Sequence, residues 1–174
     1  APCRPGRPKA APQQAMWVEL ISSPDQWADQ TEAWAALAAE AIVPNVFYEP
    51  WMLLPAIPRF GAGRNLRLAL VFSPYPTDHH APPTLCGVFP LEITSRYTGA
   101  HHGIPVSTLS LWKHKYCYLS TPLIRTERAA ETLDAFFSWL DAGSHGCTLM
   151  QFKDITVDGP FHHLLTDSSA RPRN

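Results

Sequence analysis

Charge is scarce in this sequence of 174 residues, and neither sign dominates. Only 17% of the residues are charged, and the formal net charge is −1. A chain with so little net charge has no overall electrostatic attraction for nucleic acid or for an anionic membrane surface. We therefore expect no nucleic-acid partner.

Long apolar runs are also missing. No stretch approaches the ~20 apolar residues that a membrane-spanning helix needs, so we expect no membrane span. The first 14 residues, APCRPGRPKAAPQQ, are proline-rich and basic, and they lack the apolar centre of a signal peptide. We interpret residues 1–16 as a flexible basic tail. The first residue is not Met, as is expected of a processed form or a fragment.

Cysteine is sparse and irregularly spaced. No two of the four cysteines form a CxxC pair, which argues against a zinc ribbon or a thioredoxin motif: Cys3, Cys86, Cys117 and Cys147. A chain of this length buries a sufficient core without disulfide staples. Wide cysteine spacing then favours reduced thiols and a cytoplasmic location, with one disulfide left open.

Metal and nucleophile motifs are absent as well. HExxH does not occur, and GSHG at 143–146 lacks the spacing of a nucleophile elbow. The eight histidines include three adjacent pairs, which lie in or beside predicted loops: His79-His80, His101-His102 and His162-His163. Zinc needs three or four convergent ligands. We interpret these pairs as solvated and expect no metal site, with a metalloenzyme as a distant alternative.

Glycine-rich phosphate loops have one weak candidate, RFGAG at 59–63. A phosphate loop leads from a strand into the N-terminus of a helix. This stretch instead follows a helical segment and precedes a strand. We predict a helix end followed by a turn.

What the sequence does have is apolar periodicity. It predicts a strand at 17–21 and a helix from about Pro24 to Ala41, with Ser23 as its cap and Gln26 closing a capping box. Pro50 favours a second helical start, but Pro55 and Pro58 predict only one to three short turns that end near Gly61.

The rest of the chain alternates between strand and helix signals. Apolar alternation predicts strands at 66–72 and 85–93 that form a hairpin, with a bulge or strand end at Pro90. One or two strands are predicted in 108–119, followed by extended segments at 122–124 and 148–155. A helix capped by Thr126 is predicted to stop at Gly143, and a last helix at 160–165 is capped by Asp158. This order predicts an α/β fold with a mixed sheet.

The aromatic-rich segment LWKHKYCYL is the strongest candidate for a site. On a strand, one side would carry four side chains that could line a substrate cleft: Trp112, His114, Tyr116 and Tyr118. The same pattern is equally typical of the buried face of a sheet, and both interpretations remain open at this point.

Several motifs together resemble a known family. They are PNVFYEPWML at 44–53, GVFPL at 87–91, KHKYCYLSTPLI at 113–124, FFSWL at 136–140 and DGPFHHLL at 158–165. Over about Trp17 to Leu165 the chain resembles the N-terminal part of the CelD/BcsL-like proteins. These belong to the GNAT superfamily of N-acyltransferases and are associated with cellulose or exopolysaccharide biosynthesis.

The resemblance implies a GNAT-like mixed sheet flanked by helices over 17–165, with 166–174 a tail or the start of a second domain. It implies acyl-CoA as co-substrate, held mainly by a second GNAT half, and a small-molecule or saccharide acceptor. The superfamily signature R/Q-x-x-G-x-G/A is not met, because Pro58 stands first in PRFGAG. No cofactor-binding residue is therefore assigned.

The resemblance also places FYEPWMLLPAI beside the acceptor cleft. Tyr48, Trp112 and His114 are the candidate acceptor contacts, and Glu49, His114 and Tyr116 are the candidate groups for proton transfer. Two functions follow as hypotheses. One is a GNAT-type acyltransferase or its N-terminal half, and the other is a degenerate, non-catalytic GNAT domain that docks a partner or a second domain.

Overall fold

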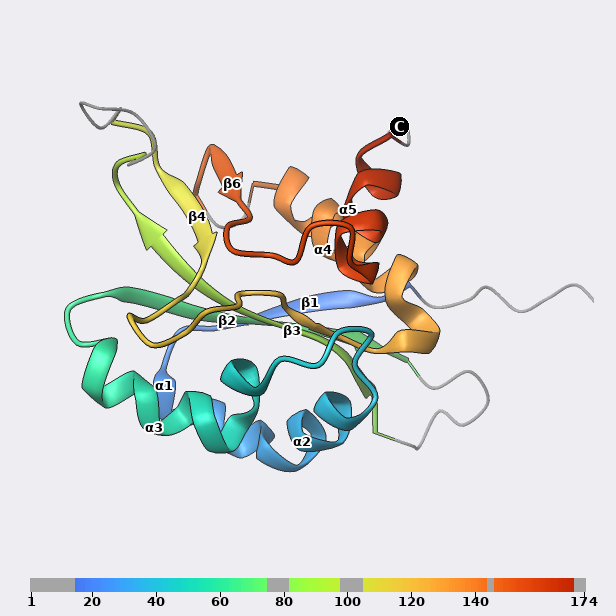
Figure 1. Ribbon diagram of the computed structural model, residues 1–174, viewed down its shortest axis with the longest axis horizontal. Coiled ribbons are helices and arrows are strands. Elements are labelled where there is room, and N and C mark those ends of the chain that lie inside the picture. The colour runs from blue at the N-terminus through green and yellow to red at the C-terminus, as the bar shows by residue number, and fades with distance from the viewer. Residues whose placement is uncertain (1–14, 75–81, 98–104, 144–145, 171–174) are drawn as a thin grey trace, which may run out of the picture.

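The computed structural model describes residues 15–74, 82–97, 105–143 and 146–170, which form one sheet between two layers of helices (Figure 1). The basic tail up to residue 14, His79-His80 and His101-His102 lie outside the described residues. The strands are β1 (Trp17–Ile21), β2 (Asn65–Ser73), β3 (Thr84–Thr94), β4 (Thr108–Leu111), β5 (Leu123–Ile124) and β6 (Leu149–Gln151). Their order is β1-β2-β3-β4-β6, and β5 pairs with β3.

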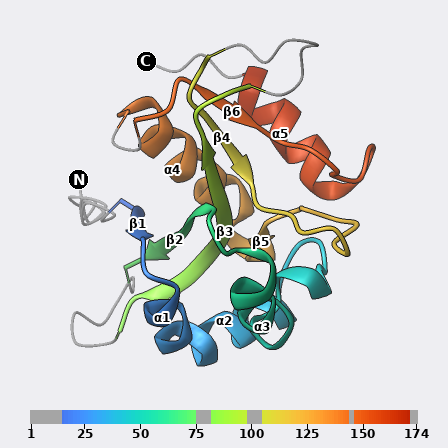
Figure 2. The ribbon, with the colours of Figure 1, turned by 90° about the vertical axis from the view of Figure 1, so that its left-hand side faces the viewer.

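The helices cover both faces of the sheet, as Figures 1 and 2 show. On one face lie α1 (Pro24–Trp27), α2 (Thr31–Ala39) and α3 (Pro50–Phe60), and on the other lie α4 (Ala129–Asp141) and α5 (Pro160–Ala170). Short 3-10 turns are η1 (Ala28–Gln30), η2 (Val46–Tyr48) and η3 (Thr126–Arg128). None of the helices in the described ranges has the length and apolarity needed to cross a bilayer.

The hairpin of β2 and β3 is confirmed and forms the centre of the molecule. Its antiparallel register runs from Asn65 opposite Ile93 to Ser73 opposite Thr84. One face of β2 enters the core under α1–α3 through Leu66, Leu68, Leu70 and Phe72. The other face enters the core under α4, so a strand buried on both sides carries the apolar run that its sequence requires.

The predicted α/β class with a mixed sheet flanked by helices is confirmed. β1 to β4 pair antiparallel, whereas β6 runs parallel to β4 from Thr108 opposite Leu149 to Ser110 opposite Gln151. A parallel neighbour requires a crossover connection, and α4 lies within it.

Pro24 and Pro50 lie in the first turns of their helices and the second helix ends at Gly61, as predicted, but the continuity of both helices was predicted wrongly. The helix expected from Pro24 to Ala41 is divided into α1, η1 and α2 and ends at Ala39, and Ser23 makes no side-chain capping bond. Conversely, α3 runs unbroken through Pro55 and Pro58. Both of these prolines are exposed, while Leu53, Ala56 and Ile57 bury the opposite face. Packing of that face outweighs the lost backbone hydrogen bonds.

The bulge predicted at Pro90 lies elsewhere. Register shifts at Cys86, because Val71 faces Gly87 and Phe72 faces Leu85. Pro90 instead lies in regular β3, where its carbonyl oxygen accepts a hydrogen bond of 2.8 Å from the backbone N–H of Trp112.

The strand predictions after residue 107 are too long, and one helix cap is misplaced. β4 ends at Leu111 instead of Leu119, and β6 covers only 149–151 of the predicted 148–155. Thr126 does not cap α4, because its hydroxyl donates to the Glu40 carbonyl oxygen at 2.8 Å. The predicted stop of α4 is confirmed: Gly143 has φ +70° and donates to Leu140.

Candidate functional site

Three of the candidate residues meet in an aromatic cluster, formed by Phe60, Trp112, His114 and Tyr116. The His114 ring stacks on Phe60 with centroids 4.8 Å apart, and Tyr116 meets Phe60 edge-on at 5.6 Å. The ring centroids of Trp112 and His114 are 5.8 Å apart. The segment is a turn and not the predicted strand, since the Cys117 N–H donates to the His114 carbonyl oxygen at 2.9 Å.

Burial divides the cluster into an inner and an outer part. Trp112 is fully buried and His114 is 8% exposed, whereas Tyr116 is 55% exposed. The ammonium of Lys115 lies 4.8 Å from the centre of the Tyr116 ring. The interpretation as a buried face is confirmed for Trp112 and His114, and the cleft interpretation stays a prediction that rests on the exposed Tyr116.

A backbone hydrogen bond selects one tautomer of the neutral His114 ring. Its Nδ1 accepts a hydrogen bond of 3.3 Å from the Tyr116 N–H, so the neutral ring carries its proton on Nε2. Burial lowers the pKa of the imidazole below its ordinary value of 6.5. Near neutral pH, Nε2 is a hydrogen-bond donor, and the ring does not offer a free basic nitrogen there.

Tyr48 contacts the aromatic cluster through a hydrogen bond to Trp112. It ends η2 and is fully buried, and its hydroxyl donates to the carbonyl oxygen of Trp112 at 2.8 Å. Burial, followed by the nearby Cys117 thiol, holds the pKa of the Tyr48 phenol well above its ordinary value. The phenol therefore stays protonated and acts as a structural donor.

Glu49 makes its hydrogen bonds at the start of α3 and not with the aromatic cluster. Its carbonyl oxygen accepts from the N–H groups of Met52 and Leu53, which begin α3. Its carboxylate accepts a hydrogen bond of 2.6 Å from the indole of the exposed Trp51. The structure thus brings Tyr48, Trp112, His114 and Tyr116 together, and gives Glu49 a separate role at the start of α3.

Loop 113–122 separates β4 from β5 and closes onto the chain that follows β6. The Lys113 ammonium lies 2.7 Å from the Asp154 carboxylate. The Ser120 N–H donates to the Asp154 carbonyl oxygen at 3.1 Å, and the Ser120 hydroxyl donates to the Lys153 carbonyl oxygen. In α/β sheets, ligands commonly bind beyond the carboxyl ends of the strands. In this protein the segments that follow β4 and β6 are joined by these hydrogen bonds and this ion pair, beyond the carboxyl ends of the two parallel strands.

Two residues that hold this arrangement were not identified from the sequence. Phe60 stacks on His114, but it lies in a helix that was expected to be broken. Asn45 is 2% exposed, and its side-chain amide donates to the carbonyl oxygens of Leu119 and Thr121 at 3.3 and 2.7 Å. Its side-chain oxygen accepts from Phe47 N–H, a local turn contact that an Asn before a short turn indicates.

The glycine-rich stretch is a helix end, as predicted. Gly61 caps α3, and its N–H donates to the Ile57 carbonyl oxygen at 2.7 Å, while Gly63 turns the chain with φ +75°. That N–H is consequently not available to a phosphate. Within the described ranges, His, Cys, Asp and Glu side chains form no group of three or more that could hold a metal ion.

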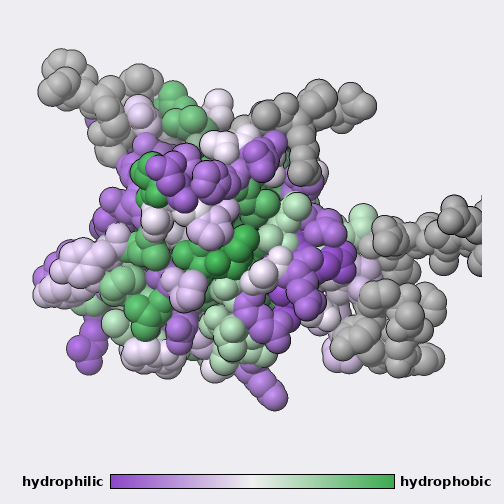
Figure 3. Space-filling model, turned by 45° about the vertical axis from the view of Figure 1, so that its right-hand side comes forward, coloured by the Kyte–Doolittle hydropathy of each residue, from purple (hydrophilic) through white to green (hydrophobic). Residues whose placement is uncertain are grey.

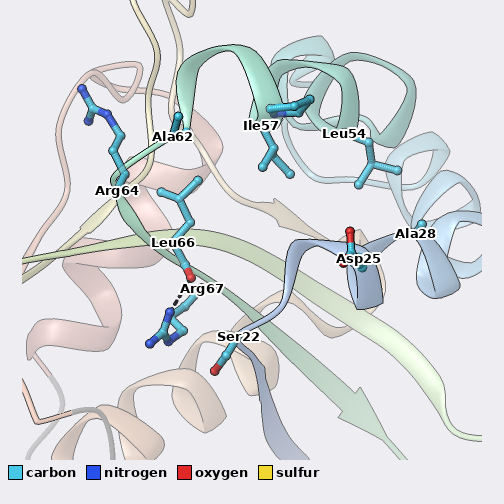
Figure 4. A pocket seen from close by; sticks show the side chains of 11 residues that line it. Ser22, Asp25, Ala28, Leu54, Ile57, Ala62, Arg64, Leu66 and Arg67 are labelled. Carbon is cyan, nitrogen blue, oxygen red and sulfur yellow. Dashed lines mark hydrogen bonds between the residues drawn. The ribbon is translucent and has the colours of Figure 1, made fainter.

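A cavity of about 610 Å³ lies on the other side of α3, between α1, the end of α3 and the start of β2 (Figure 4). Its lining includes Gly61 and Ala62 of the glycine-rich stretch but none of the candidate acceptor-contact or proton-transfer residues. Nothing in the apolar pattern indicated it, because it depends on where β1 ends relative to β2.

Comparison with known proteins gives one structural likeness. No protein-family model matches the chain, and no curated protein sequence matches it. The chain is similar to the crystal structure of the aminoglycoside antibiotic 6′-N-acetyltransferase from Acinetobacter baumannii, with 15% identity and a TM-score of 0.48. The similarity covers 91% of this chain and 92% of that one.

Proposed function

We propose that this chain is a GNAT-like acyltransferase domain that contributes the acceptor side of the reaction. The observation that carries the proposal is a meeting of two motifs. PNVFYEPWML and KHKYCYLSTPLI are far apart in sequence, yet Tyr48 bonds to Trp112, which directly precedes the second motif, and Asn45 bonds to Leu119 and Thr121. Phe47 also meets Tyr118 edge-on at 6.1 Å. Both motifs are those that resemble the CelD/BcsL-like family.

The arrangement supports binding better than bond making. Phe60, His114 and Tyr116 present an aromatic surface whose outer part is exposed, and the Nε2 proton of His114 supplies a donor. Such a surface suits the face of a ring-shaped acceptor, including a saccharide, because aromatic rings pack well against flat apolar faces. The acceptor is thus proposed to be a small molecule or a saccharide.

Acyl-CoA would supply the thioester in such a reaction. The residues present do not fit its phosphates at PRFGAG, because Gly61 uses its N–H within α3 and the stretch leads into a strand. We therefore derive no acyl-transfer step from this domain. The proposal assigns the donor site to a second GNAT domain, as the family resemblance implies, and places the whole in polysaccharide or cellulose biosynthesis in the cytoplasm.

The alternative is a non-catalytic GNAT-like module that docks a partner. The hydrogen bonds of the candidate groups favour this alternative. Tyr48, Glu49 and Nδ1 of His114 are all already hydrogen-bonded within the domain. Large hydrophobic side chains are also exposed, including Trp51, Tyr118 and Val157. Figure 3 shows hydrophobic residues gathered on one face among hydrophilic ones.

Calorimetry distinguishes these possibilities. The chain is titrated with acetyl-CoA, and separately with glucosamine and with cellobiose. The proposal expects an acceptor to bind, with affinity lost in Tyr116→Ala and kept in the control Val157→Ala, which changes an exposed side chain outside the cluster, and expects little binding of acetyl-CoA. Tight binding of acetyl-CoA, with release of free CoA on adding an acceptor, would instead show independent catalysis. Binding of none of the three would favour the docking module.

A further inference from the structure

The edge of the sheet is open beside the start of β2, because β1 is the shorter strand. β1 ends with Ile21 opposite Leu68, and the chain then leaves the sheet toward α1. The first three residues of β2 therefore have no strand partner on the β1 side. Figure 4 shows Ser22, where the chain departs, and Leu66 on the part of β2 that β1 does not cover.

The backbone of Leu66 points to this open edge. The Pro90 carbonyl oxygen accepts from the Trp112 N–H, so Pro90 directs its backbone groups away from β2, and the opposed Leu68 faces β1. Residues two apart in a strand point to the same side, so Leu66 also faces the β1 side. Among the described residues, the Leu66 N–H has no hydrogen-bond partner.

A side chain covers the other backbone group of Leu66. The Arg67 guanidinium folds back and donates to the Leu66 carbonyl oxygen at 2.8 Å, as Figure 4 shows. With Arg67 in this position, Leu66 is 4% exposed. An unpaired strand edge is a template for a further strand, and several recognition domains bind extended peptides in this way. A single opposed residue would exchange both of its backbone hydrogen bonds with Leu66.

A cavity lies on the face toward which the side chain of that opposed residue would point. Residues opposite each other in an antiparallel pair direct their side chains to the same face, and the Leu66 side chain enters the core under α1–α3. On that face, the cavity of about 610 Å³ is lined by Ala28, Leu54 and Ile57 (Figure 4). This volume accommodates a large apolar side chain.

We infer that the edge of β2 binds an extended segment of a partner polypeptide as an added antiparallel strand, with a large apolar side chain opposite Leu66 buried in the cavity. The N–H and C=O of that residue bond to the C=O and N–H of Leu66, and the Arg67 guanidinium moves aside. Because β1 occupies the same line as far as Ile21, the bound segment starts there or turns away from the sheet at that point. The inference does not depend on the acyl transfer proposed above.

Three blocked peptides test the inference by calorimetry. Acetyl-Phe-Thr-Val-amide, the parent peptide, places its aromatic residue opposite Leu66 and is expected to bind. The analogue that has alanine in place of phenylalanine is expected to bind at least about tenfold more weakly, because the apolar side chain is lost. The analogue with an N-methylated phenylalanine cannot donate to the Leu66 carbonyl oxygen, and is expected to bind roughly two- to tenfold more weakly.

Variants of the protein test the two parts of the site separately. Arg67→Ala removes the group that competes for the Leu66 carbonyl oxygen, so it should tighten binding of the parent peptide roughly two- to tenfold. Arg59→Ala, which removes an exposed arginine outside the cavity, is the control and should have no effect. Ala28→Trp should fill the cavity and weaken binding at least about tenfold, whereas the matched Ala33→Trp, at an exposed position outside the cavity, should not. Thermal unfolding verifies that each variant is folded.

Amide hydrogen exchange locates the bound peptide. Without peptide, the Leu66 amide should exchange faster than that of Leu68, which pairs with β1, and the parent peptide should slow exchange at Leu66. The inference is overturned if the parent peptide does not bind, if exchange at Leu66 is not slowed, or if Arg67→Ala weakens binding. Equal affinity for the N-methylated analogue would also overturn it, because the cavity would then take an apolar group without strand pairing.

Discussion

The hydroxyl of Tyr48 donates to the carbonyl oxygen of Trp112 at the point where β3 has no donor to offer. Leu91 lies opposite Leu111, so the next opposed pair is Pro90 and Trp112. The Trp112 N–H reaches the Pro90 carbonyl oxygen at 2.8 Å, but the return bond is impossible because proline has no N–H. β4 ends here, and the phenol of a distant turn supplies the missing donor.

Tyr48→Phe is therefore expected to destabilise the domain by about 1–3 kcal/mol, because the buried carbonyl oxygen of Trp112 loses the donor that replaces the missing N–H of Pro90. Urea unfolding measures the change. Tyr118→Phe is the matched control, since Tyr118 is 79% exposed, and it should stay within about 0.5 kcal/mol of the wild type. Pro90→Ala in the Tyr48→Phe background restores an N–H opposite Trp112 and should recover part of the loss. Equal losses in the two Tyr→Phe variants would contradict this account.

Gly87→Ala should be costly for a steric reason. A Cβ at Gly87 would lie 2.7 Å from Cγ2 of Thr132 on α4, and 3.2 Å from Cγ2 of Val71. The expected loss in the free energy of unfolding is about 1–3 kcal/mol, the usual cost of overpacking. Thr132→Ser removes that methyl group and retains the hydroxyl bond to the Arg128 carbonyl oxygen. The double variant should thus lose less than the sum of the single ones, and strict additivity would refute the contact.

The fold was predictable where the pattern is local. Leu66, Leu68, Leu70 and Phe72 alternate along one strand, and this periodicity is sufficient to place β2 and its hairpin partner. α3 was misjudged because a rule about proline inside helices is also local, whereas burial of Leu53 against the sheet is not. Short-range patterns cannot weigh a broken hydrogen bond against a distant packing partner.

The candidate site was predictable only as a set of residue types. Trp112, His114 and Tyr116 were chosen for an alternation that the chain does not adopt, because it turns after Trp112. They still meet, through Phe60, a contact between segments more than fifty residues apart. Pro90 is the available signal, because in a central strand a proline marks where the neighbouring strand must leave, whereas the sequence pattern alone predicts a bulge or strand end there.

Asn45→Ala should release loop 113–122. The Asn45 side-chain amide donates to Leu119 and Thr121, and the loop also bonds to Asp154 through the Ser120 N–H. Without Asn45, amide hydrogen exchange at Ser120 should accelerate, and stability should fall by about 1–3 kcal/mol. Asn65→Ala changes an exposed residue at the start of β2 and serves as control. Unchanged protection of Ser120 would mean that Asn45 does not hold the loop.

His114 should make stability depend on pH in a defined direction. Burial lowers its pKa in the folded state below the ordinary value of 6.5, so between these two values the unfolded chain binds the proton more readily. The contribution of the neutral ring is thus fully present above about pH 6.5 and is lost as pH falls through the folded-state pKa. The stability difference between wild type and His114→Gln, measured by urea unfolding, should shrink from about pH 7.5 to about pH 5.5. A proton NMR titration of the His114 ring should give a midpoint below 6.5. Parallel profiles for the two proteins, or a midpoint above that value, would show that the stacked ring on Phe60 is not desolvated.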